Sequence, residues 1–171
     1  SVGRRGAVSQ PRRINVADVR GAQTVTTAVS TSAQAVRKFD LAVVIDTTGS
    51  MGDELEYLKT ELLDILGDIR ARHRGLDVRV SVIAYRDQGD EYVTRTFAFT
   101  NDINAIQSSL SAQSANGGGD YPEAMEVAMN RAVAMNWRPD AVKSLLLVAD
   151  APPHGEDVPA TWNAAEVARG K

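Results

Sequence analysis

The sequence predicts a doubly wound α/β domain, in which a mostly parallel sheet carries helices on both faces. Residues 41–45 are a short, continuous apolar run, the pattern of a strand buried on both faces, and residues 143–149 repeat this pattern in their apolar part, residues 145–149. Residues 51–72 instead repeat leucine and isoleucine at helical spacing, which gives this segment one core-facing stripe. Strands that alternate with helices favour a parallel sheet covered on both sides.

The other elements follow from local signals. Gly75 ends the first helix, and a turn at residues 88–90 favours antiparallel pairing of the strands on either side. Pro122 suits the first position of a helix. In chain order, we expect a strand at 78–85, an edge strand at 92–99, a short helix at 101–111, a flexible loop at 115–119, a helix at 122–135 and a last helix from about 159 to 171.

Composition fits one globular domain. The chain has 171 residues, of which 43% are hydrophobic and 24% charged, enough for a single sizeable core. It has no cysteine, which excludes disulfides and thiolate metal sites. No apolar run is long enough to span a membrane, and we expect no membrane span. Composition does not indicate a location.

Charge divides the chain into a basic arm at residues 1–38 and an acidic domain at residues 39–171. The arm holds seven Lys/Arg against one acidic residue, Asp18, whereas the domain holds 12 Lys/Arg against 21 Asp/Glu. A basic arm could bind nucleic acid, but its arginine pairs have no interleaved aromatic residues. We therefore favour an extended arm or linker that packs on its own acidic domain, and do not expect nucleic acid as a partner.

Oxygen-bearing side chains follow the expected strands. Asp46, Thr48 and Ser50 come directly after the first strand, and Asp150 ends the strand at 143–149. Asp120 closes a glycine run before the helix that Pro122 opens. Because ligands of open α/β sheets gather at the carboxyl ends of the strands, we expect these three loops to converge. Carboxylate and hydroxyl oxygens are hard ligands that suit Mg²⁺.

Each of these side chains has a simpler interpretation when taken alone. Ser50 and Asp53 fit a helix capping box, and Asp46 could complement a helix dipole. Asp120 could serve a turn and Asp150 could cap a loop. Their shared position at one edge of the sheet favours a metal site over these four simpler interpretations.

Nearby polar residues are interpreted as surface groups. We interpret Asp87, Asp90 and Glu91 as a solvated hairpin rather than a second ion site. His154 is expected in a loop, near enough to the site to modulate it.

Together these motifs resemble the von Willebrand factor type A (vWA) domain and its metal-ion-dependent adhesion site. The family pattern is Asp-x-Ser-x-Ser after the first strand, a threonine or acidic residue in a glycine-rich loop, and an aspartate after the fourth strand. Here Thr48 replaces a serine but keeps the hydroxyl, and Asp120 stands where many members carry threonine. The resemblance covers residues 39 to about 168 and implies a Rossmann-like vWA fold.

The resemblance also implies a function in binding rather than catalysis. The hydroxyls of Thr48 and Ser50 would bind Mg²⁺ or Mn²⁺ directly, while Asp46 and Asp150 would bind it directly or through water, and Asp120 in either way. An open position on the ion would take a carboxylate from a protein partner. The residues expected on the partner-binding rim are Met51, Asp87, Tyr121 and His154. The family favours an extracellular or cell-envelope location.

Two other functions stay open. The first is a phosphohydrolase related to phosphoaspartyl and haloacid-dehalogenase enzymes, with Asp46 as nucleophile. No Gly-Asp-x-x-x-Asp motif follows Val148, however, and Lys143 precedes the last strand rather than following it. The second is a structural subunit of an assembly that binds no metal.

The family's fold normally continues beyond the elements expected here, so we expect the domain to be truncated at its C-terminal end. An open sheet edge would follow, and it would favour self-association or completion of the sheet by another chain.

Overall fold

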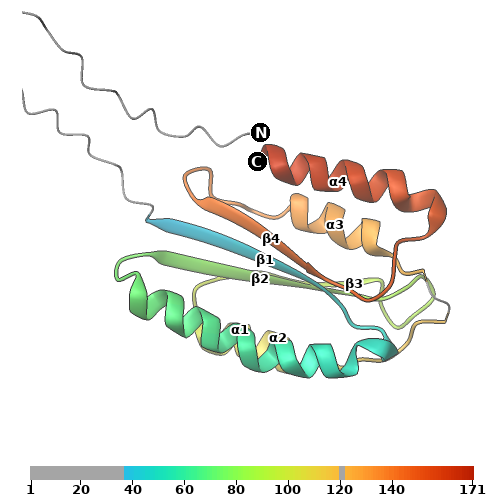
Figure 1. The fold of residues 1–171 in the computed structure, drawn as a ribbon, viewed down its shortest axis with the longest axis horizontal. Coiled ribbons are helices and arrows are strands. Elements are labelled where there is room, and N and C mark those ends of the chain that lie inside the picture. Colours follow the sequence, from blue (N-terminus) through green and yellow to red (C-terminus); the bar gives the residue numbers. More distant parts are fainter. Residues whose placement is uncertain (1–36, 120–121) are drawn as a thin grey trace, which may run out of the picture. The chain divides into compact units, whose positions relative to one another are not determined.

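The computed structural model describes residues 37–119 and 122–171 of the protein (Figure 1). The predicted arm therefore lies outside the described residues, except for Arg37 and Lys38, and Lys38 already belongs to the first strand. The strands are β1 (Lys38–Asp46), β2 (Asp77–Tyr85), β3 (Thr94–Thr100) and β4 (Val142–Val148). The helices are η1 (Gly49–Met51), α1 (Gly52–Arg72), α2 (Ile103–Ser111), α3 (Met125–Val133), η2 (Gly155–Asp157) and α4 (Val158–Gly170).

The predicted α/β fold is confirmed. The sheet has the order β3-β2-β1-β4, with β1 parallel to both of its neighbours and β3 antiparallel to β2. Helices α1 and α2 lie on one face of the sheet, and α3 and α4 lie on the other (Figure 1). The chain first adds strands on one side of β1 and later places β4 on its other side. The order reverses at β1 and β4, which is where such folds bind ligands.

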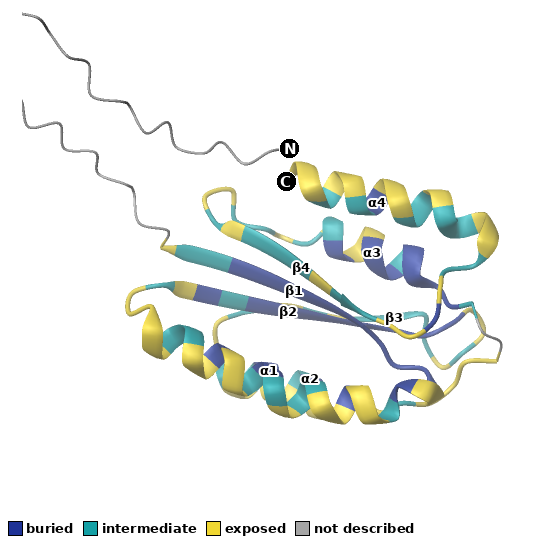
Figure 2. Ribbon diagram, in the orientation of Figure 1, coloured by how far each residue is buried: buried dark blue, intermediate teal, exposed yellow. Residues whose placement is uncertain are grey.

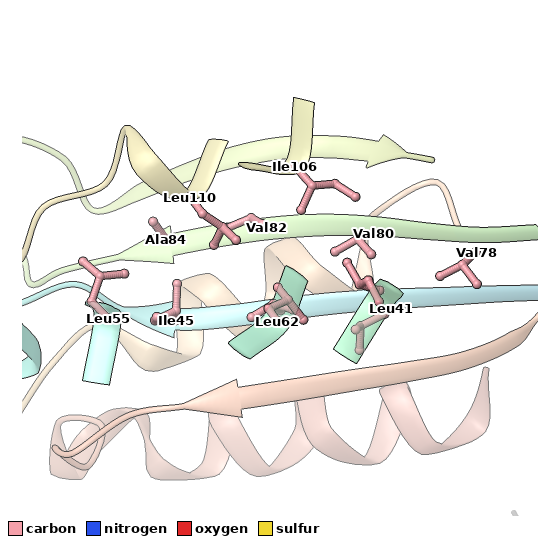
Figure 3. Close-up of a cluster of buried hydrophobic side chains, with 12 residues drawn as sticks. Leu41, Ile45, Leu55, Leu62, Val78, Val80, Val82, Ala84, Ile106 and Leu110 are labelled. Atoms are coloured by element: carbon pink, nitrogen blue, oxygen red, sulfur yellow. The ribbon is translucent and has the colours of Figure 1, made fainter. Parts of the chain in front are cut away.

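Two apolar cores flank the sheet. Alternate residues of β1 point to opposite faces, so Val43 and Ile45 belong to the core under α1 and α2, and Ala42 and Val44 to the core under α3 and α4. Figure 3 shows the first core, in which Leu62 of α1 lies against the sheet. Burial on both faces explains why the β1 sequence is a continuous apolar run, and Figure 2 shows its buried course.

The predicted start of the third helix is wrong. Helix α3 begins at Met125, not at Pro122. The backbone N–H of Glu123 donates to the carbonyl of Pro152 at 3.0 Å, and Glu123 forms an isolated parallel bridge with Pro153. This pairing with the loop after β4 keeps the segment out of the helix.

The expected burial of the last strand on both faces is also wrong. Val142 is 48% exposed and Leu146 is 41% exposed. Leu146 pairs with Val43 and therefore points to the α1 face of the sheet, whereas Leu145 and Leu147 pack on the opposite core. Within the described residues, β4 has only β1 as a strand neighbour. No helix of this part of the chain is both long and apolar enough to cross a membrane.

A buried ion-pair network closes the amino end of the sheet. Asp40 is fully buried and accepts hydrogen bonds from the guanidinium groups of Arg79 and Arg138. The backbone N–H of Arg138 also donates to Asp40, at 2.8 Å. Burial alone would raise the pKa of Asp40, but the hydrogen bonds from Arg79 and Arg138 hold it below its usual value. This network joins β1, β2 and the segment before β4, far from the carboxyl ends of the strands.

Candidate metal centre

Asp46, the last residue of β1, is fully buried at the carboxyl edge of the sheet. Its Oδ1 accepts hydrogen bonds from the backbone N–H of Thr48 at 2.9 Å and from the Thr48 hydroxyl at 2.7 Å. Its Oδ2 is buried and makes no hydrogen bond of good geometry to the described residues, although the neighbouring Tyr85 hydroxyl acts on the carboxylate and opposes the rise in its pKa that burial causes. A buried carboxylate oxygen in this state costs free energy unless a further group satisfies it. The loop therefore holds the carboxylate through Oδ1, and Oδ2 has only the Tyr85 hydroxyl beside it and is the oxygen that a ligand could engage.

The two hydroxyls of the motif differ in exposure. Thr48 is buried, whereas Ser50 lies exposed in the short helix η1. The capping-box interpretation of Ser50 is wrong, because the N-cap of α1 is Met51 and no side chain caps that helix. The Ser50 hydroxyl thus has no structural role in the helix and is accessible.

The glycine-rich loop is tied directly to the Asp46 loop. The backbone N–H of Gly49 donates to the carbonyl of Gly117 at 3.1 Å, and the N–H of Asn116 donates to the carbonyl of Thr47 at 3.0 Å. Gly118 has φ of +77°, and a Cβ there would lie 3.0 Å from Glu123 Oε1 and 3.1 Å from Thr48 Cβ. The glycine is required both by the backbone conformation and by this close approach.

Asp150, the residue expected to complete the site, lies exposed just after β4. Its loop is attached to the site through the Glu123–Pro152 hydrogen bond. Two other predicted residues, Asp120 and Tyr121, lie outside the described residues.

Negative charge accumulates around Asp46. Burial is the main cause that raises the pKa of Asp46, and the charge of Asp150 raises it further, although the Thr48 hydrogen bonds act in the opposite direction. Burial and the carboxylate of Asp46 also raise the pKa of the neighbouring Tyr85 hydroxyl. A bound cation would relieve this repulsion. No group of three or more His, Cys, Asp or Glu residues in the described part of the chain is arranged to hold a metal. The candidate site differs from such a group because half of its predicted ligands there are hydroxyls.

The structure agrees only in part with the prediction that the partner-binding rim is exposed. Met51 is fully buried and Asp87 is 5% exposed, so neither is available to a partner at the surface. Asp87 Oδ1 instead lies 2.8 Å from Nε2 of His154, which is half-buried. This contact links the loop after β2 to the loop after β4.

The interpretation of the acidic hairpin as solvated is wrong for two of its three residues. Asp90 Oδ2 accepts the backbone N–H groups of Gly118 at 3.0 Å and Asp87 at 3.1 Å. Glu91 alone is exposed, and it pairs with Arg86 and Arg95. The hairpin thus supports the glycine-rich loop.

Sequence reasoning missed Arg86 as part of the site. This arginine directly follows the apolar run of β2, and a charge at that position is the signal that could have identified it. Arg86 is 3% exposed, and its side chain donates to the carbonyl of Thr47, in the loop after β1, and to that of Ser114, directly before the glycine-rich loop.

The position of Lys143 weakens the phosphohydrolase alternative. Lys143 lies at the start of β4, where its Nζ donates to the carbonyl of Lys171 at 3.0 Å. Asp46 lies at the other end of the parallel pair, so this lysine is not available to a phosphate bound there.

The fold and the site geometry define an α/β domain with a candidate oxygen-ligand cation site at its carboxyl edge. Residues 40–164 match the family model described as von Willebrand factor A domain. The chain therefore belongs to the von Willebrand factor A domain family. The predicted resemblance to that domain is confirmed, and the metal-ion-dependent adhesion site stays a prediction.

Curated relatives are much longer than this chain. The chain is 32% identical over 120 residues to "Alpha-protein kinase vwkA" of Dictyostelium discoideum, covering 69% of this chain and 19% of that protein. It is 36% identical over 118 residues to "Putative ariadne-like RING finger protein R811" of Acanthamoeba polyphaga mimivirus, covering 67% and 11%. The chain thus spans a fifth or less of each of these relatives.

Solved structures share the fold at lower identity. The pilus adhesin SpaC from Lactobacillus rhamnosus GG, in its open conformation, has a TM-score of 0.58 at 21% identity, over 70% of this chain and 15% of that one. The vWF domain of the pilus tip protein Mfa5 from Porphyromonas gingivalis has a TM-score of 0.53 at 18% identity, over 68% and 38%. These likenesses establish the fold.

Proposed function

We propose that this vWA domain is a protein-binding module that binds a divalent cation, Mg²⁺ or Mn²⁺, and through it a carboxylate of a protein partner. Thr48 and Ser50 would supply hydroxyl oxygens, and Asp46 and Asp150 would supply carboxylates, directly or through water. Asp120 is proposed as a further ligand of either kind. Bound there, the ion would act as a Lewis acid that accepts the partner's carboxylate.

One observation carries this proposal. The buried Asp46 carboxylate has one oxygen that makes no hydrogen bond of good geometry to the described residues, and Asp150 adds a second negative charge near it. Two carboxylates that repel each other, in a motif that also carries the buried Thr48 hydroxyl and the accessible Ser50 hydroxyl, favour a hard cation. The hydroxyls carry no charge, so the ion would keep enough positive charge to attract a further carboxylate.

The domain itself is proposed to be non-enzymatic, since the proposal requires neither a nucleophile nor a base. The pilus adhesins among the fold neighbours support an adhesive role and a cell-surface location for this chain. The curated relatives named as a kinase and a RING finger protein are nearer in sequence, so the whole protein's activity and partners belong to the proposal as well.

Calorimetric titration of Mg²⁺ and Mn²⁺ tests the proposal. Ser50→Ala is the sharpest variant, because Ser50 is exposed and its removal should leave the fold intact. Ser111→Ala, at the exposed end of α2, is the matched control. We expect saturable binding to the parent and to the control, and strongly weakened binding to Ser50→Ala.

Two outcomes would contradict the proposal. Equal binding by Ser50→Ala and the parent would place the ion elsewhere. A folded parent that binds no ion, yet still binds a protein partner, would favour the structural-subunit alternative.

A further inference from the structure

Arg86 occupies an unusual position for a charged side chain. It follows β2 directly, and it is 3% exposed. Its guanidinium lies over the ring of Tyr92, 4.4 Å from the centroid, and makes one ion pair with Glu91 at 3.4 Å. Burying a charge destabilises the folded state unless the hydrogen bonds of the charged group are well satisfied. The hydrogen bonds that satisfy the buried guanidinium therefore indicate the role of Arg86.

Those contacts join the two predicted ligand loops. Arg86 Nε donates to the carbonyl of Thr47 at 3.2 Å, and Nη2 donates to the carbonyl of Ser114 at 2.9 Å. Thr47 lies between the predicted ligands Asp46 and Thr48, and Ser114 directly precedes the glycine-rich loop. Both loops thus meet at one rigid guanidinium.

Neighbouring contacts act in the same direction. The carbonyl of Thr47 also accepts the N–H of Asn116, and the Thr47 hydroxyl lies 2.8 Å from the hydroxyl of Tyr92. The backbone N–H of Arg86 donates to the carbonyl of Val93, which holds the hairpin that carries Tyr92. A planar fork with five N–H donors can reach carbonyls on separate segments, which a lysine ammonium does with less fixed geometry.

We propose that Arg86 is a positioning residue of the cation site, which holds the loop of Asp46, Thr48 and Ser50 against the glycine-rich loop. This inference rests on the proposed function. Arg86 does not bind the ion, and its own positive charge would repel a nearby cation. The two possible effects of Arg86 on ion binding therefore have opposite signs: loss of positioning weakens binding, whereas loss of the charge alone strengthens it.

The test compares Mg²⁺ dissociation constants by calorimetry for Arg86→Met, which removes the charge, and Arg86→Lys, which keeps the charge but loses the fork. We expect the dissociation constant to rise about tenfold or more in both, the size typical when groups that orient metal ligands are removed. Arg95→Met is the matched control. Arg95 also lies over Tyr92 and pairs with Glu91, but among the described residues it makes no hydrogen bond or ion pair with either ligand loop. The Mg²⁺ dissociation constant of Arg95→Met should stay within twofold of that of the parent.

Amide hydrogen exchange in metal-free protein provides a second measurement. The N–H groups of Gly49 and Asn116 connect the two loops, so we expect them to exchange faster in Arg86→Met and Arg86→Lys but not in Arg95→Met. Comparison with amides of the central strand separates this local effect from a general loss of stability. Arg86→Lys provides the readout if Arg86→Met does not fold.

Several results would overturn the inference. Unchanged dissociation constants in both folded Arg86 variants would do so. So would tighter binding by Arg86→Met with parental binding by Arg86→Lys, because that pattern is electrostatic alone. If the parent binds no Mg²⁺, the proposed function fails, and the exchange rates of Gly49 and Asn116 then decide whether Arg86 holds the loops together. Unchanged rates would refute that role.

Discussion

Removing the Asp40 carboxylate should strongly destabilise the fold. Asp40→Ala deletes four hydrogen bonds, two from Arg79 and two from Arg138. The side chains of these arginines are only 20% and 15% exposed, so their charges lose a buried partner. Breaking a buried ion pair from one side costs about 3–5 kcal/mol. Because Arg138 keeps its contact with Asp77, we expect the lower end of this range.

Urea denaturation at neutral pH and fixed protein concentration measures this change. With a slope of about 1–3 kcal/mol per molar urea, the midpoint should fall by roughly 1–3 M. Asp140→Ala is the control, because its pair with Lys38 is exposed, and exposed ion pairs contribute little. A midpoint for Asp40→Ala that equals the Asp140→Ala midpoint would refute the view that the network stabilises the sheet.

The pH dependence of this effect follows from the direction of the pKa shift. The pKa of Asp40 is lowered in the folded state from 3.8, so its contribution to stability is present above that pH and is lost as pH falls through the folded value. The stability difference between Asp40→Ala and the parent should therefore narrow in acid below about pH 4. A difference that is constant from pH 7 to pH 3 would contradict this reasoning.

Three further predictions concern the site and the core. The pKa of Asp46 is raised in the folded state, so its ionised form lowers the stability of the fold; this loss is absent below pH 3.8 and complete once pH rises past the folded pKa. Asp46→Asn in EDTA at pH 7 should therefore raise the urea midpoint, and the same variant should lose Mg²⁺ binding. A lowered urea midpoint would contradict this reasoning. Gly118→Ala should lower the free energy of unfolding by about 1–2 kcal/mol and weaken Mg²⁺ binding, because φ at this position is positive and the added Cβ would crowd Thr48. Gly119→Ala is the control, because there is open space around that position, and it should do neither. Leu62→Ala should open a cavity in the core and lower the free energy of unfolding, measured by urea denaturation, by about 2–5 kcal/mol. Tyr57→Ala is the control, because Tyr57 is 67% exposed, and it should lower the free energy of unfolding far less. Equal losses would argue against the packing of α1 on the sheet.

The sequence predicted well those features whose cause is local. The apolar run of β1 and the stripe of α1 identify themselves by periodicity, and the motif from Asp46 to Ser50 is contained in five residues. The start of α3 was missed because its cause, the hydrogen bond from Glu123 to Pro152, joins residues 29 positions apart.

The supports of the site were missed for the same physical reason. Arg86 reaches Thr47 across 39 positions of sequence, and Arg138 reaches Asp40 across 98. Periodicity can place a strand and a loop, but it does not say which distant side chain holds them. Whether Asp46, Ser50 and Asp150 bind an ion stays a prediction until the titration is made.

The place of each strand in the sheet gives the candidate site two unequal halves. Asp46 is the last residue of β1, which is paired on both sides and buried on both faces. Asp150 follows β4, which among the described residues pairs with β1 alone and exposes Leu146. Strands with few buried contacts open locally at a smaller free-energy cost than the whole fold. Amides of β4 should therefore exchange through local opening while those of β1 exchange only through global unfolding. Local opening of β4 would then move Asp150 away from the candidate site while Asp46 stays in place.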